Sequence, residues 1–138
     1  MKTNVELIST RVYAGRLKDR ENLNNSSSGG AFTALSDFFL KNGNAVVAAI
    51  YNYENHTTEF QMILDKDQRE RAKGSKYMQS KPGGIFREAY RWLMDNSGKK
   101  MLFVGMGCQS DGFRKFSEIK EIRDRVYIVD IICHGSPS

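Results

Sequence analysis

The chain has 138 residues, of which 40% are hydrophobic and 27% are charged, and its formal net charge is +5. This composition is typical of one globular domain with a hydrophobic core, and it excludes disordered and collagen-like chains. No apolar run approaches the roughly 20 residues that a membrane-spanning helix needs, and the N-terminus does not resemble a signal peptide, so we expect a cytoplasmic protein without a membrane span.

The positive charge is concentrated in one stretch of the chain. Residues 66–100 contain ten Lys or Arg and four Asp or Glu, a net charge of +6, and the rest of the chain is almost neutral. Such a segment suits an anionic ligand, whether nucleotide phosphate, nucleic acid or an acidic protein surface, although a solvated basic face is the commoner explanation. Nucleic acid ranks last because the segment carries no recognised motif and few aromatic residues. We therefore expect no nucleic-acid partner.

The first half of the chain predicts one helix and a pair of strands after a poorly patterned start. Residues 5–13 alternate loosely and are interpreted as an edge strand or an extended lead-in, and residues 16–25 are interpreted as a loop. Apolar residues at three-and-four spacing predict a helix over about 29–41. Residues 45–51 form a continuous apolar run, typical of a strand buried on both faces, and residues 57–64 alternate as the returning strand of a hairpin.

The second half predicts two helices and two strands. One helix begins at 85 and ends at 96–98, and the other lies around 113–119; the strands are a short one at 101–104 and a last one at 126–132. The highly charged stretch 66–73 is compatible with a helix. We expect the short strand to end at Gly105, because a glycine punctuates the apolar run there. The alternation of elements predicts the α/β class, as a single layered domain over residues 1–138 with a mixed β-sheet flanked by helices.

A polar run with two glycines, residues 26–30, immediately precedes the first predicted helix. The first turn of a helix carries unpaired N–H groups and the positive end of the helix dipole, and glycines allow a phosphate to approach the backbone, so this stretch fits an anion site. Serine is also a preferred N-cap residue, and from this stretch alone a plain helix cap is the favoured interpretation. At an anion site, alanine at Gly29 and Gly30 should lower ligand affinity and leave the helix nearly unchanged.

Two loops that follow apolar strands carry the two cysteines of the chain. Cys108 lies at a predicted helix start, where the pKa of a thiol falls, so it fits a nucleophilic or redox cysteine, a metal ligand or a flavin neighbour. The alternative is a small buried residue without a chemical role. Cys133 and His134 form a similar pair. Zinc is improbable because the chain has no Cys-x-x-Cys spacing and no evident fourth ligand, and the elements of a zinc deaminase are absent.

Four segments occur in a fixed order along the chain. They are residues 26–32 (Ser-Ser-Ser-Gly-Gly-Ala-Phe), 74–80 (Gly-Ser-Lys-Tyr-Met-Gln-Ser), 103–109 (Phe-Val-Gly-Met-Gly-Cys-Gln) and 130–138 (Asp-Ile-Ile-Cys-His-Gly-Ser-Pro-Ser). Together they resemble the coenzyme F420 hydrogenase/dehydrogenase beta-subunit family. The resemblance implies a flavoprotein that passes electrons between flavin adenine dinucleotide (FAD), iron–sulfur clusters and a deazaflavin or another redox partner.

The resemblance also implies roles for particular residues. The serines and glycines before the first helix would hold phosphate with Lys76, Tyr77 would stack on a flavin or adenine ring, and Gln109 would hydrogen-bond the flavin edge. The implied cofactor-binding set is Ser27, Ser28, Gly29, Gly30, Ser75, Lys76, Tyr77, Ser80, Gly107 and Gln109. Cys108 and Cys133 are implied cluster ligands only if a longer chain supplies the others, because two cysteines cannot hold a four-iron cluster.

The chain departs from the family in ways that favour a fragment or a degenerate member. The family usually reads Gly-Thr-Pro-Cys-Gln where this chain has Gly-Met-Gly-Cys-Gln at 105–109, and members continue well past the last segment. We expect this piece alone to be inactive and free of a cluster, and to bind flavin weakly or not at all. The alternative is a non-catalytic nucleotide-binding or assembly domain. In either case Cys108 and Cys133 should follow neighbouring strands and lie close to the helix start at Gly30.

Overall fold

A mixed β-sheet forms the centre of the computed structural model, which describes residues 11–133 and 135. Within these residues the sheet has four strands in the order β2-β1-β3-β4. The strands are β1 (Ala45–Asn52), β2 (Thr57–Ile63), β3 (Met101–Met106) and β4 (Val126–Ile131). β2 pairs with β1 in an antiparallel hairpin, whereas β1, β3 and β4 are parallel. The predicted α/β fold with a mixed sheet is confirmed.

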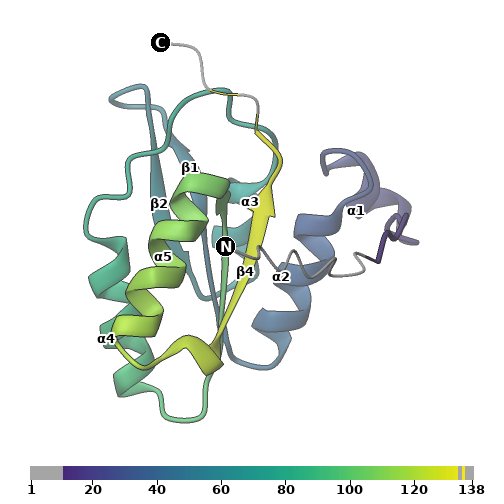
Figure 1. The fold of residues 1–138 in the computed structure, drawn as a ribbon. Coiled ribbons are helices and arrows are strands. Elements are labelled where there is room, and N and C mark those ends of the chain that lie inside the picture. Colours follow the sequence, from purple (N-terminus) through teal and green to yellow (C-terminus); the bar gives the residue numbers. More distant parts are fainter. Residues whose placement is uncertain (1–10, 134, 136–138) are drawn as a thin grey trace, which may run out of the picture.

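Helices cover both faces of the sheet (Figure 1). α2 (Ala31–Lys41) and α3 (Lys66–Ala72) lie on one face, and α4 (Ile85–Asp95) and α5 (Gly107–Ile119) lie on the other. Under α4 and α5 the core is aromatic: the Phe103 ring stacks between Phe60 and Phe113, with ring centroids 5.2 and 4.5 Å away. Burial of these large rings removes much apolar surface from water and fixes the helices on the sheet.

Three local features differ from the sequence-based expectations. α1 (Arg20–Asn24) is a short helix where a loop was expected, and the Asp19 side chain caps it by accepting the Asn22 N–H at 2.8 Å. A 3-10 turn, η1 (Arg123–Arg125), precedes β4. β3 continues through Gly105 to Met106, because both residues pair with β4. Gly105 is a glycine for a steric reason, since a Cβ there would lie 2.9 Å from the Phe103 ring.

The structure describes only the end of the stretch 5–13, which was expected to be an edge strand or an extended lead-in. Residues 1–10 lie outside the described residues, and residues 11–13 are not part of a strand. β4 is the edge of the sheet opposite β2, and within the described residues no strand pairs with its outer side. Tyr127 and Ile131 on this edge strand are exposed.

A buried ion-pair network joins α3 to α2. The Arg69 side chain is 3% exposed, and its Nη2 lies 2.9 Å from Asp37 Oδ1 on α2 and 3.2 Å from Glu70 Oε1. Glu70 also accepts from Lys73 at 2.8 Å. A guanidinium buried this deeply needs its carboxylate partners, so the network fixes α3, and with it the segment that follows, against α2.

Candidate functional site

The parallel strands bring three loops to one edge of the sheet. β1, β3 and β4 all end there, α5 begins directly after β3, and α2 begins there because it runs back toward the start of β1 (Figure 1). The segments 26–31, 104–109 and 129–133 therefore line one cleft of about 610 Å³, which residues 72–78 close from the side of α3. This volume lies in the range of small-molecule and cofactor sites.

The cleft gathers most of the residues that the sequence singled out. Seven of the ten predicted cofactor-binding residues line it, as does one of the two cysteines: Ser27, Gly30, Ser75, Lys76, Tyr77, Ser80, Gln109 and Cys133. Four predicted residues are not part of its lining: Ser28, Gly29, Gly107 and Cys108. The lining that sequence reasoning missed is mostly apolar, with Ala48, Ala49, Phe60, Val104 and Val129 from the sheet.

The glycines before α2 have a conformational reason to be glycines. Gly30 is the N-cap of α2 and has a φ of 76°, in the left-handed region that favours glycine. Gly29 packs on the chain crossing it: its carbonyl accepts the Leu17 N–H at 2.9 Å, and a Cβ on Gly29 would lie 2.5 Å from the Gly15 carbonyl oxygen. These requirements are independent of any ligand, so the glycines by themselves do not identify an anion site.

The helix start still presents free donors toward the cleft. Among the described residues no acceptor pairs with the N–H groups of Ala31, Phe32 or Thr33, as expected for the first turn of a helix. The Ser26 and Thr33 hydroxyl groups are already engaged, because Ser26 Oγ lies 2.7 Å from Thr33 Oγ1 and donates to the Asn22 carbonyl. The exposed Ser27 hydroxyl and the backbone amides are therefore the main polar groups that this side of the cleft offers.

Lys76 is turned toward its own loop. Its ammonium group donates to the carbonyl oxygens of Lys73 (2.8 Å) and Gly74 (3.1 Å), and also to that of Ala72 at the end of α3. Burial lowers the pKa of Lys76 to about 8. The group thus shapes the segment 73–78, and its predicted contact with phosphate stays a prediction.

Gln109 joins two walls of the cleft. Its Oε1 accepts the Met106 N–H at the start of α5, and its Nε2 donates to the Ser80 carbonyl, each at 3.1 Å. Ser80 itself is buried, next to Lys81, which pairs with β2. The side chain therefore fixes the segment 75–81 against the end of β3, and its predicted contact with a flavin edge stays a prediction.

The two cysteines follow neighbouring parallel strands, as the sequence predicted. Cys108 is in the first turn of α5 after β3, and Cys133 comes after β4, with its Sγ 3.4 Å from Met106 Sδ. Both are free and exposed. His134 lies outside the described residues. In the part of the chain that the structure describes, no three His, Cys, Asp or Glu side chains gather in a metal-binding arrangement.

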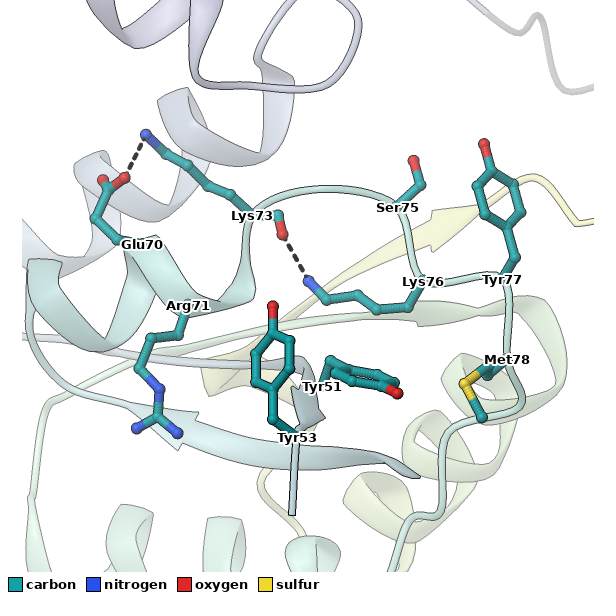
Figure 2. Close-up of a pocket in the computed structure, with 9 residues that line it drawn as sticks. All are labelled: Tyr51, Tyr53, Glu70, Arg71, Lys73, Ser75, Lys76, Tyr77 and Met78. Atoms are coloured by element: carbon teal, nitrogen blue, oxygen red, sulfur yellow. Dashed lines mark hydrogen bonds and ion pairs between the residues drawn. The ribbon is translucent and has the colours of Figure 1, made fainter. Parts of the chain in front are cut away.

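A second cavity shares a wall with the cleft. This cavity, the tyrosine pocket, has a volume of about 560 Å³ and is shown in Figure 2. It is lined by Tyr51, Tyr53, Glu70, Arg71, Lys73, Ser75, Lys76, Tyr77 and Met78. Sequence reasoning missed it, because Tyr51 and Tyr53 lie 18 or more positions before Arg71 and meet it only through packing of α3 on β1.

Comparison with known proteins places the chain in a family. The family described as "Coenzyme F420 hydrogenase/dehydrogenase, beta subunit N-term" matches residues 12–83, more than half of the chain. The chain belongs to this family. The match includes the serine–glycine segment before α2 and the segment 74–80, so two of the four ordered motifs lie inside it.

The fold of this beta-subunit family member is similar to that of a solved structure. A chain of the F420-reducing [NiFe] hydrogenase complex from Methanosarcina barkeri, solved in a xenon derivatization study, matches with a TM-score of 0.70 and 23% identity. The match covers 86% of this chain and 42% of that one, so the present chain spans less than half of its length. No significant match was found among curated proteins. None of the described helices is long and apolar enough to cross a membrane.

Proposed function

We propose that this chain is a flavin-binding part of a redox module, that FAD occupies the cleft between the starts of α2 and α5, and that a redox partner protein or a deazaflavin exchanges electrons with it. Bound flavin would supply the electron-transfer chemistry. The observation that carries the proposal is the convergence of residues from four distant motifs on one cleft at the carboxyl ends of parallel strands, where ligands bind in open α/β sheets.

The chemistry of the cleft walls supports this ligand. The floor of Ala48, Ala49 and Val104 offers apolar contact to a planar ring, and the free amides at the start of α2 offer donors to a phosphate. The chain's own contribution is to bind and orient the ligand and to exclude water from the apolar floor. We leave an iron–sulfur cluster out of the proposal, because the described residues bring no third ligand to Cys108 and Cys133.

Partner proteins enter the proposal through the family. The similar solved chain is part of a hydrogenase complex, and we infer that the present chain likewise acts beside other redox subunits. The alternative is a non-catalytic nucleotide-binding or assembly domain. It predicts that FAD binds in the cleft but that no partner reduces the bound FAD. Flavin binding is therefore the first point to test.

The test is an NMR titration of the ¹⁵N-labelled 138-residue chain with FAD, which detects even weak binding. Amide shifts should concentrate on Gly30, Ala49 and Gln109, which line only the cleft. Gln109→Leu should weaken binding about tenfold or more, because it frees the segment 75–81, whereas Gln61→Leu on β2, outside the cleft, should not. An FAD titration that leaves the three cleft amides unshifted rules the proposal out.

A further inference from the structure

We propose that the tyrosine pocket is a second, separate binding site and that it takes a planar aromatic molecule carrying an anionic group. The pocket shares residues of the segment 73–78 with the cleft, whereas Tyr51, Tyr53, Glu70 and Arg71 line the tyrosine pocket alone. The proposal does not rest on flavin binding in the cleft.

Exposed aromatic rings provide the planar surface. Tyr51 and Tyr53 pack edge to face with ring centroids 4.9 Å apart, and the Tyr51 hydroxyl lies 3.0 Å from His56 Nδ1, so Tyr51 holds Tyr53 in place. Tyr53 is nevertheless 81% exposed, and Tyr77 across the pocket is also exposed. Figure 2 shows the Tyr53 ring standing upright beside the flat Tyr51 ring, with the loop of Lys76 and Tyr77 above them. A planar ligand can stack on such rings without disturbing the core.

Charge in the pocket favours an anion. Arg71, Lys73 and Lys76 line it, against one carboxylate, Glu70. Glu70 is already engaged by Lys73 at 2.8 Å and by the buried Arg69 at 3.2 Å, so it is not free to repel or replace an anionic ligand. The pocket therefore carries an excess of positive charge beside its aromatic rings.

Arg71 is the residue that would bind the anionic group. Lys73 and Lys76 donate to Glu70 and to backbone carbonyls, whereas no carboxylate of the described residues pairs with Arg71. Arg71 and Tyr53 both line the pocket, Arg71 from α3 and Tyr53 from the turn after β1 (Figure 2). A free guanidinium binds phosphate or carboxylate with two parallel hydrogen bonds.

The test is an NMR titration of the labelled chain with adenosine 5′-monophosphate, with adenosine and inorganic phosphate as separate probes. The nucleotide should shift the amides of Tyr53 and Arg71, which line only the tyrosine pocket, and bind at least about tenfold more tightly than adenosine. Arg71→Gln should remove that advantage. Arg87→Gln, an exposed arginine on α4, should leave it unchanged.

A second pair of variants tests the aromatic contact. Tyr53→Leu should weaken nucleotide binding about fivefold or more, whereas Tyr13→Leu, at an equally exposed tyrosine outside the pocket, should not. Four results would each overturn the proposal. They are equal affinity for nucleotide and adenosine, a nucleotide affinity that Arg71→Gln does not change, amide shifts confined to Gly30 and Gln109, and no amide shift at all. Because the two cavities have separate reporter amides, FAD binding in the cleft can fail while this site is confirmed, and the reverse.

Discussion

Replacement of Gly30 by alanine separates a backbone requirement from a ligand requirement at the start of α2. Sequence reasoning expected the helix to tolerate alanine and the cost to fall on ligand affinity. The structure corrects the first part for Gly30, because its φ of 76° is unfavourable for any residue with a Cβ. The new methyl group would also overlap the Leu17 side chain, whose Cγ lies 2.8 Å from the position that a Cβ on residue 30 would occupy.

The size of the effect follows from these two contacts. A residue other than glycine in the left-handed region costs about 1–2 kcal/mol, and displacement of the half-buried Leu17 side chain brings the total to about 1–3 kcal/mol. For a chain of this length, each kcal/mol corresponds to roughly 4 °C in melting temperature. Gly30→Ala should therefore lower the melting temperature by roughly 4–12 °C without any ligand present.

Circular dichroism thermal melts of ligand-free protein measure this change. Gly107→Ala is the matched control: Gly107 also begins a helix, but its φ is not positive and nothing lies within 4 Å of the place that a Cβ would take there. The control should melt at the wild-type temperature or slightly above it, because alanine favours helix. A Gly30→Ala protein that melts within a degree of wild type, or a control that falls as far, would refute the reasoning.

Three further predictions concern side chains away from the helix start. Asp37→Asn should lower the free energy of unfolding by about 3 kcal/mol in urea titrations, because buried Arg69 loses its best-placed carboxylate, and an unchanged midpoint would contradict this. Burial holds the pKa of Lys76 at about 8 in the folded chain, so between pH 8 and 10.5 the unfolded chain binds more protons than the folded one. The free energy of unfolding should therefore rise with pH in this range, and Lys76→Met should reduce the rise. Cys108 and Cys133 are both exposed, so Ellman's reagent should titrate two thiols without denaturant, and fewer than two would speak against the described exposure.

The elements of the fold were predictable where one pattern was sufficient. The continuous apolar run of β1 specifies a buried strand, and the three-and-four spacing of α2 specifies a helix, through local sequence alone. The buried face of α2 was predicted only in part, because Thr33, Ser36 and Phe39 are buried while the apolar Leu35 and Phe38 are exposed. α1 was missed because a five-residue helix has no apolar periodicity, and its cap at Asp19 is a single side-chain contact. Gly105 was misread because its reason is steric and comes from Phe103 and Phe60, whose rings meet it only in the folded sheet.

The candidate site was predictable as a set of segments and less so as a set of contacts. Motifs that follow parallel strands converge by topology, so the order of the elements was enough to bring Gly30, Gln109 and Cys133 to one cleft. The direction of a long side chain depends on acceptors that only the folded loop creates, as the carbonyls around Lys76 show. The apolar floor and the tyrosine pocket arise from packing between distant elements, and no local pattern marks them.

Among residues 11–133 and 135 no strand pairs with the outer side of β4, and this has a consequence for how the protein behaves in solution. Its outer amide and carbonyl groups face away from β3, and Tyr127 and Ile131 leave apolar surface beside them. A strand edge of this kind is a template on which another extended chain can add. We expect the purified chain to self-associate as its concentration rises. A monodisperse preparation should require another polypeptide segment that covers this edge.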